Sequence, residues 1–125
     1  MVYLTLEDIL DIRDQIGAAY NDRFEIMSSN GLMSALAAPR RSAFGAEVFP
    51  TLAEKAGALV YALIQNHPFW DGNKRIGTAA LQLFLGRNGA TLAVSDAELQ
   101  AFTTAIARGA LRDDAIAVWV GSHLE

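Results

Sequence analysis

The segment His67–Arg75, called here the motif segment, has the sequence His-Pro-Phe-Trp-Asp-Gly-Asn-Lys-Arg and carries the residues best suited to chemistry. An unperturbed histidine titrates near pH 6.5 or so, which suits a general base acting on a hydroxyl group at about neutral pH. A lone histidine is more often a helix cap or a hydrogen-bonding group in the core, and His123 keeps that interpretation. His67 is a catalytic candidate because an anion site and a carboxylate follow it within the same segment.

The two cations of the motif segment fall at the predicted start of a helix. Asn73 opens this helix, so Lys74 and Arg75 occupy its first turn, although the helix macrodipole favours acidic residues there. Backbone N–H groups without helical partners, the permissive Gly72 and two cations together describe an anion site, with phosphate as its natural ligand. The alternative is that Lys74 and Arg75 only reach out to surface carboxylates.

Asp71 lies between the histidine and the two cations. A carboxylate beside a phosphate site is repelled unless a divalent cation bridges the two groups, and Mg²⁺ is bound in that way. The residue types therefore predict a general base, a metal ligand and a phosphate site in one short segment. Phe69 is expected in the core, whereas Trp70 fits either the surface or the lining of the site.

Helical patterns dominate on both sides of the motif segment. Capping-box patterns, in which Ser or Thr precedes an acidic residue by three positions, predict helix starts at Thr5, Thr51 and Ser95. The predicted helices run from Thr5 through Ile16, from an N-cap at Asn30 to before Pro39, over 51–66, over 73–88 with an end near Asn88-Gly89, over 96–108, and from Asp113 or Asp114 onwards.

Helices 51–66 and 73–88 are apolar on nearly all sides over part of their length, which is typical of buried helices. Small residues such as Gly57 and Gly77 would let their backbones approach closely. We expect a central antiparallel pair, wrapped by the other helices, with the loop 67–72 at its end. Two segments break the helical pattern: 43–49 is interpreted as an extended flap or small hairpin, and 91–94 as a short extended connector.

The 125 residues fit a single domain, 1–125, and 52% of them are apolar, too many for intrinsic disorder. A net charge of −4 argues against non-specific nucleic-acid binding, and the absence of cysteine excludes disulfides and thiolate chemistry. No secretory signal or membrane span is predicted, since the longest apolar run, Ala56–Ile64, falls short of the roughly 18 residues required. A cytoplasmic location fits these features, and Leu124-Glu125 is given no function.

The motif segment resembles the signature of the Fic/Doc family, H-x-F-x-(D/E/N)-(G/A)-N-(G/K)-R. The resemblance extends to Asn30-Gly31-Leu32 with Ala35, to Glu54-Lys55-Ala56 and to Phe84-Leu85 with Asn88-Gly89, and covers roughly residues 25–120. It implies an all-α fold, a helical bundle in which the motif joins a central helix pair and a small β-hairpin flap registers the target. The flap residues would be Phe44, Gly45 and Val48.

Typical Fic enzymes transfer AMP: their histidine deprotonates a target hydroxyl, which attacks the α-phosphate of ATP. Those enzymes have glycine at the position of Lys74 and a second arginine at the position of Thr78. With these two departures the chain resembles the Doc (death on curing) branch, whose members are toxins and protein kinases. In that branch the nucleotide presents its γ-phosphate, the known target is a threonine of elongation factor Tu, and its modification halts translation.

Carried over residue by residue, the resemblance assigns a role to most of the motif segment. It implies His67 as general base, Asp71 as Mg²⁺ ligand, Gly72 and Asn73 as the anion hole, and Lys74 and Arg75 as phosphate-binding residues. It also implies ATP as substrate, Mg²⁺ as cofactor, and an antitoxin that inserts a helix near the flap as partner. Gly72 stands where the founding toxin has alanine. The alternative functions are AMP transfer to a protein hydroxyl and a non-catalytic binding module that keeps the fold.

Overall fold

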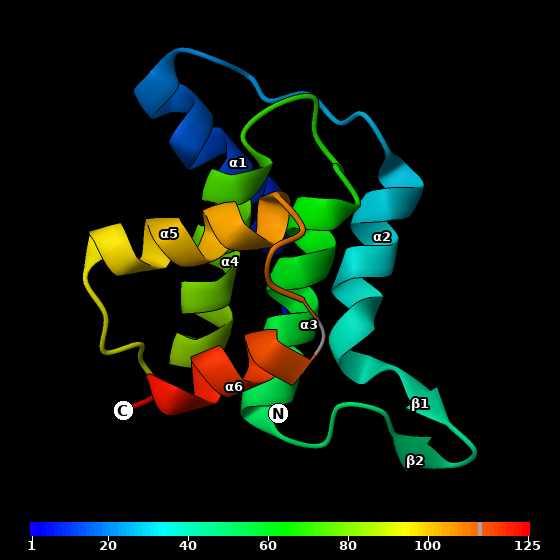
Figure 1. Ribbon diagram of the computed structural model, residues 1–125. Helices are drawn as coiled ribbons and strands as arrows, with labels where there is room; N and C mark the ends of the chain where they lie inside the picture. The colour runs from blue at the N-terminus through cyan, green and yellow to red at the C-terminus, as the bar shows by residue number, and fades with distance from the viewer. Residues whose placement is uncertain (113) are drawn as a thin grey trace.

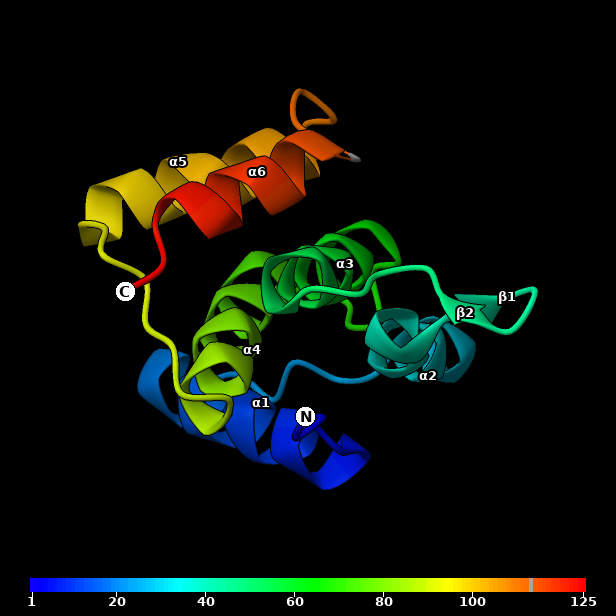
Figure 2. The same cartoon turned by 90° about the horizontal axis from the view of Figure 1, so that it is seen from below.

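Helix α3 (Leu52–Gln65) is the central element of the structure, a computed structural model that describes residues 1–112 and 114–125. It runs antiparallel to α4 (Asn73–Arg87), and the loop between them lies at one end of the pair (Figure 1). Four further helices surround this pair: α1 (Leu6–Tyr20) packs on α4, α2 (Ser29–Ala37) on α3, and α5 (Asp96–Ala107) and α6 (Asp114–Ser122) cover the opposite side of α3 (Figure 2). The predicted all-α bundle with a central helix pair is confirmed.

Side-chain caps fix where most of these helices begin. The three predicted capping boxes, at Thr5, Thr51 and Ser95, are all formed and open α1, α3 and α5. The predicted N-cap Asn30 is wrong, because the Ser28 hydroxyl accepts a 2.9 Å hydrogen bond from the Gly31 N–H and α2 begins at Ser29. The last helix is described from Asp114 onwards; Asp113, the other predicted start, lies outside the described residues.

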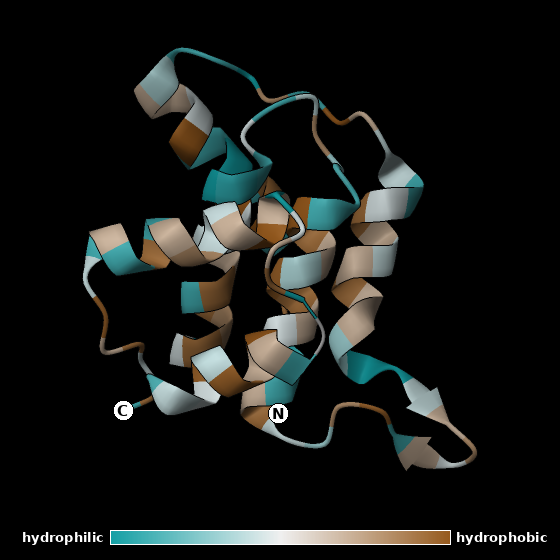
Figure 3. Cartoon of the chain, viewed as in Figure 1, coloured by the Kyte–Doolittle hydropathy of each residue, from teal (hydrophilic) through white to brown (hydrophobic). Residues whose placement is uncertain are grey.

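Two glycines allow close packing of the central helices, Gly77 within the central pair as predicted, and Gly57 against α6 instead. A Cβ atom on Gly57 of α3 would lie 3.2 Å from the side chain of Ile116 on α6, and one on Gly77 of α4 would lie 3.1 Å from Ile64 on α3. Hydrophobic positions recur along each helix (Figure 3), and the fully buried side chains include Phe84 and Leu85 of α4 and Phe69 of the loop. Within the described residues, no helix has both the length and the apolar character needed to cross a bilayer.

The predicted flap is a two-stranded antiparallel hairpin that follows the 3₁₀ turn η1 (Ala38–Arg40). Strand β1 (Ser42–Ala43) pairs with β2 (Ala46–Glu47) in the register Ser42 to Glu47. The turn residues Phe44 and Gly45 have φ values of +53° and +78°, as tight two-residue hairpins require. Phe44 is fully exposed at the tip, and Val48, which follows β2, is also exposed.

The predicted connector 91–94 is also extended. Leu92 forms an isolated antiparallel bridge with Leu124, and the backbones of Thr91 and Glu125 exchange two hydrogen bonds. Leu124 and Glu125, which the sequence leaves without a function, therefore have a structural role, because they hold the end of the chain against the segment between α4 and α5.

Candidate active site

The segment that connects α1 to α2 fastens the loop between α3 and α4 through main-chain hydrogen bonds. The N–H groups of Met27 and Ser28 donate to the Pro68 carbonyl at 2.8 Å and 3.1 Å. The Trp70 N–H donates to the Glu25 carbonyl at 3.0 Å. The loop backbone is thus fixed by the protein itself, before any ligand binds.

Asn73 closes this loop onto the start of α4. Its side-chain Oδ1 accepts a 3.0 Å hydrogen bond from the Phe69 N–H, and its Nδ2 donates at 2.8 Å to the Phe69 carbonyl. The Phe69 ring is buried in the core, as predicted. The amide of Asn73 is therefore used to brace the loop, so the backbone N–H is the donor that this residue can contribute to the predicted anion site.

Gly72 is required at its position for two independent reasons. Its backbone is left-handed, with φ +80° and ψ 7°, where it serves as the N-cap residue of α4. A Cβ atom would also lie 3.0 Å from the ring of Phe24, which packs beneath the loop. The Gly72 N–H donates a 2.7 Å hydrogen bond to Oδ1 of Asp71, so the carboxylate is oriented by the backbone next to it.

The start of α4 presents backbone donors that have no partner among the described residues, together with two cations. The first backbone hydrogen bond of the helix runs from the Ile76 N–H to the Gly72 carbonyl at 2.9 Å, so the N–H groups of Asn73, Lys74 and Arg75 precede the ladder. Lys74 and Arg75 are exposed. Neither forms an ion pair with any carboxylate in the described part of the chain, which argues against the alternative of simple surface pairing.

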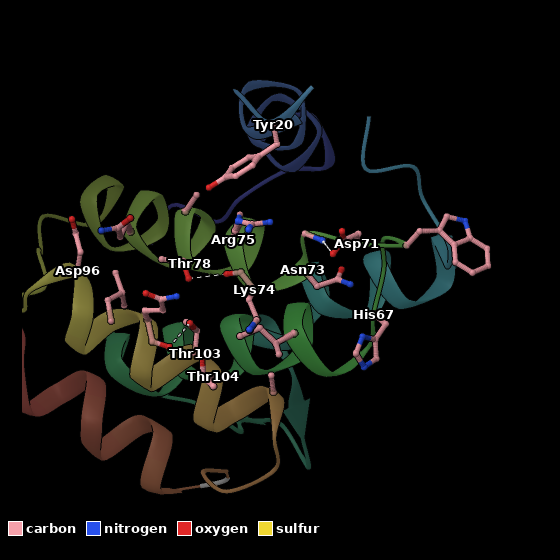
Figure 4. A pocket seen from close by; sticks show the side chains of 18 residues that line it. Tyr20, His67, Asp71, Asn73, Lys74, Arg75, Thr78, Asp96, Thr103 and Thr104 are labelled. Atoms are coloured by element: carbon pink, nitrogen blue, oxygen red, sulfur yellow. Dashed lines mark hydrogen bonds between the residues drawn. The ribbon is translucent and has the colours of Figure 1, made fainter. Parts of the chain in front are cut away.

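A cavity of about 840 Å³ opens beside this helix start (Figure 4). All six predicted residues of the motif segment line it: His67, Asp71, Gly72, Asn73, Lys74 and Arg75. Its volume lies in the range of small-molecule sites and is far larger than a single phosphate needs. The cavity can therefore hold a phosphate-bearing ligand of nucleotide size. The predicted flap residues Phe44, Gly45 and Val48 are not among the residues that line it.

His67 is exposed and lies at one side of the cavity, and Asp96 lies at the opposite side (Figure 4). The His67 backbone is left-handed, with φ +46°, a conformation uncommon for residues other than glycine. The loop thus holds the imidazole at the rim, where a hydroxyl from another molecule can reach it. Trp70, which the sequence leaves open, is 71% exposed at this rim.

Sequence reasoning missed the wall of the cavity that lies opposite the motif. This wall comes from α5, with Leu99, Gln100, Thr103 and Thr104, while Tyr20 at the end of α1 borders the cavity beside the motif segment. Tyr20 contacts the motif directly, since the Arg75 guanidinium carbon lies 4.1 Å from the centre of its ring. No local pattern marks these residues, because their place at the site depends on how α1 and α5 pack against α4.

The chain matches known proteins in two comparisons. The chain matches the family model described as the Fic/DOC family over residues 3–85, which include the loop and most of α4. It is also similar to Toxin Doc of Mycolicibacterium smegmatis (strain ATCC 700084 / mc(2)155), with 36% identity over 91 residues. That alignment covers 73% of this chain and 68% of the relative.

Proposed function

Because this chain belongs to the Fic/DOC family, on its Doc branch, we propose that it is the toxin of a toxin–antitoxin pair and acts as a protein kinase. The proposed reaction moves the γ-phosphate of ATP to a Ser or Thr hydroxyl of a translation factor, with elongation factor Tu as the first candidate, and so blocks translation. One observation carries the proposal: His67, Lys74 and Arg75 border a single cavity large enough for a nucleotide.

His67 is the proposed general base. It takes the proton of the target hydroxyl as the hydroxyl oxygen forms a bond to the γ-phosphorus. The bond between that phosphorus and the β,γ-bridging oxygen breaks, and ADP leaves. The exposure of His67 at the rim supports this role, because the acceptor hydroxyl belongs to a second protein and must approach from outside.

Lys74, Arg75 and the first N–H groups of α4 are the proposed phosphate-binding groups. Phosphoryl transfer needs positioning and charge neutralisation more than covalent chemistry from the protein. Backbone donors at a helix start and cations without carboxylate partners supply both, because their charge is not already neutralised within the described residues.

Asp71 is the proposed Mg²⁺ ligand, and its surroundings fit that role. One carboxylate oxygen accepts the hydrogen bond from the Gly72 N–H, which leaves the second oxygen for a metal. The described residues contain no group of three His, Cys, Asp or Glu side chains suited to a metal ion. Mg²⁺ would therefore be held by Asp71 together with phosphate oxygens of ATP, a common arrangement, and would neutralise phosphate charge when bound.

Lys74 and Thr78 favour phosphate transfer over AMP transfer. Thr78 stands where AMP-transferring relatives carry a second arginine, and its hydroxyl donates a 2.7 Å hydrogen bond to the Lys74 carbonyl. That hydroxyl hydrogen is therefore used within the helix and is not offered to a nucleotide. AMP transfer remains the second candidate, because Asp71 and Gly72 match the wider Fic loop.

The flap is the proposed site of protein contact. Phe44 is a fully exposed aromatic residue held in a left-handed turn, a conformation that costs free energy and is often kept for function. We propose that Phe44, Gly45 and Val48 register the target segment, and that an antitoxin restrains the toxin by placing a helix nearby.

Intact-mass spectrometry of elongation factor Tu, incubated with this protein, ATP and Mg²⁺, tests the function. The matched control is His67→Asn, because asparagine tolerates the φ of +46° better than alanine and lacks a comparable base. We expect the mass of one phosphate to be added by the wild type and not by the variant. A mass increase of one AMP would instead identify the protein as a nucleotidyl transferase and contradict the proposed kinase activity.

If elongation factor Tu gains no mass, the next experiment incubates the protein with whole lysate and either γ-labelled or α-labelled ATP. Transfer to another protein would keep the enzyme and change its target, whereas no transfer of either label would support the non-catalytic binding module. As a check on the phosphate site, Arg75→Ala should weaken ATP binding far more than Arg108→Ala, since Arg108 is exposed and is not among the residues lining the cavity.

A further inference from the structure

We propose that Tyr20 is a positioning residue for the phosphate site, and that its ring holds the guanidinium of Arg75 ready for an anion. The proposal rests on the proposed function, because it takes Arg75 as a phosphate-binding group. It concerns a residue outside the motif segment, on α1, the first helix of the chain, whereas the motif segment begins after α3.

The contact itself joins two helices. Arg75 extends from the first turn of α4, Tyr20 is the last residue of α1, and the guanidinium carbon lies 4.1 Å from the ring centroid. Both residues line the cavity, and Figure 4 shows the Tyr20 ring reaching from α1 towards α4. A distance of this size is well within the range of an attractive cation–π contact.

An aromatic partner suits a phosphate-binding arginine better than a carboxylate would. A carboxylate would occupy the N–H donors of Arg75 and neutralise its charge, whereas a ring restrains the guanidinium through its face and leaves the donors at its edge available. Arg75 has no ion pair and no side-chain hydrogen bond to another residue of the described chain. Its charge and its donors are therefore kept for a ligand while its position is restrained.

This restraint matters more in a site without a second arginine. The neighbouring position one turn later is Thr78, whose hydroxyl is bound to the Lys74 carbonyl. A long arginine side chain loses conformational entropy when it binds phosphate, and an aromatic ring that has already restrained it reduces that loss. Tyr20 thus preorganises the guanidinium on which the site depends.

The backbone at the end of α1 fixes where Tyr20 lies. Asn21 ends the helix in a left-handed conformation with φ +52°, and the Asp22 N–H donates a 2.8 Å hydrogen bond to the Gly17 carbonyl. A Cβ atom on Gly17 would collide with the Asp22 carbonyl, so the turn is folded tightly against the helix. Two residues further on, Phe24 packs against Gly72. The same short segment therefore sets the position of both Tyr20 and the loop.

A double-mutant cycle measured by isothermal titration calorimetry tests the proposal. The variants are Tyr20→Ala, Tyr20→Phe, Arg75→Ala and the Tyr20→Ala/Arg75→Ala pair, each titrated with Mg²⁺–ATP and with inorganic tripolyphosphate. We expect Tyr20→Ala to weaken binding of both ligands by about fivefold, and Tyr20→Phe to stay within about twofold of the wild type, since the ring face is kept. In the Arg75→Ala background, Tyr20→Ala should have no further effect.

Tyr20 is 56% exposed, so its truncation should leave the fold intact. Tyr20→Leu is a second variant, which keeps apolar bulk without a ring face and should weaken binding as much as Tyr20→Ala does. A loss confined to ATP would place Tyr20 against the nucleoside and overturn the proposal. A loss that persists without Arg75 would overturn it as well. A wild type that binds neither ligand would overturn the phosphate site together with this inference, whereas normal binding without coupling would overturn the inference alone.

Discussion

Glu47 on the flap and Lys55 on α3 form an ion pair in which one partner is buried and the other is not. Their Oε1 and Nζ atoms are 2.8 Å apart, with the lysine side chain 2% exposed and the glutamate 54% exposed. Burial alone would lower the pKa of Lys55, but the hydrogen bond with Glu47 and smaller contributions outweigh it, so the pKa lies above its ordinary value. Lys55 therefore stays charged and ties the base of the flap to the central helix.

The two partners of this pair should respond unequally to substitution. Glu47→Ala removes the ion-pair partner of the buried Lys55 ammonium and leaves its 3.4 Å hydrogen bond to the Pro39 carbonyl, so we expect the free energy of unfolding to fall by about 1–2 kcal/mol. Lys55→Met removes the charge and keeps most of the volume, so it should cost less than about 1 kcal/mol. Urea unfolding followed by circular dichroism compares them, and a larger loss for Lys55→Met would contradict this account of the flap.

Gly72→Ala should destabilise the protein and the site together. The φ of +80° is strained for alanine, and its Cβ would press on the Phe24 ring at 3.0 Å, so we expect a loss of about 1–2 kcal/mol. Gly86→Ala is the matched control on the same helix. A Cβ there has no neighbour within 4 Å, and it should stabilise the helix by roughly 0.5–1 kcal/mol. Equal effects of the two changes in thermal unfolding would refute the packing argument.

Asn73→Asp should distinguish the structural role of the Asn73 side chain, which braces the loop, from the electrostatic requirements of the phosphate site. Aspartate keeps an acceptor for the Phe69 N–H, loses the donor to the Phe69 carbonyl, and places a favourable negative charge at a helix start. We expect the free energy of unfolding to stay within about 1 kcal/mol of the wild-type value. ATP binding should be at least about tenfold weaker, because the new carboxylate repels phosphate. Asn73→Ala should show the reverse order, with stability affected first. Unchanged ATP affinity in Asn73→Asp would move the anion site away from this helix start.

Acid should weaken the contact between α1 and α4 over a narrow pH range. Two hydrogen bonds from the Arg87 guanidinium, at 2.7 Å and 2.8 Å, together with those from Thr5, lower the pKa of Asp8 from 3.8 to about 2. A carboxylate with a depressed pKa contributes stability above its unfolded value and loses it as the pH falls through the folded value, here from about 4 down to 2.

The corresponding measurement compares the wild type with Asp8→Asn. At pH 6 the variant should be less stable by about 1–2 kcal/mol, a figure reduced from the full pKa shift because Arg87 is partly exposed to solvent. The difference should shrink as the pH is lowered from about 4 to 2, because the wild-type carboxyl becomes increasingly protonated over this range. A difference in the free energy of unfolding that stays constant across this pH range would mean that Asp8→Asn destabilises the protein through packing and not through loss of the ion pair.

Local signals in the sequence were sufficient for most of the fold. The capping boxes at Thr5, Thr51 and Ser95 act over three residues, so they are visible before any tertiary contact is known. The start of α2 was missed although its cap is also local, because the residue three positions after Ser28 is glycine and not an acidic residue, so no capping-box pattern marks it. The Ser28 hydroxyl accepts from the Gly31 N–H without the reciprocal acidic side chain that completes the capping boxes of α1, α3 and α5.

The candidate site likewise has a part that the sequence predicts and a part that it does not. The residues from His67 to Arg75 are contiguous, so their proximity follows from the chain itself, and the helix start at Asn73 follows from the residues around it. The partners of these residues do not follow from any local pattern. Tyr20 meets Arg75, and Phe24 meets Gly72, only because the end of α1 packs beside the motif, and such contacts depend on the complete fold.

The contact between Phe24 and Gly72 also constrains how this protein can evolve. Gly72 occupies a position where the founding toxin of the branch carries alanine, yet in this chain an alanine methyl group would meet the Phe24 ring at 3.0 Å. A change from glycine to alanine at position 72 is opposed by this contact and by the left-handed φ of +80°, and a smaller side chain at position 24 removes the first of these two obstacles. The two positions should therefore change together among relatives.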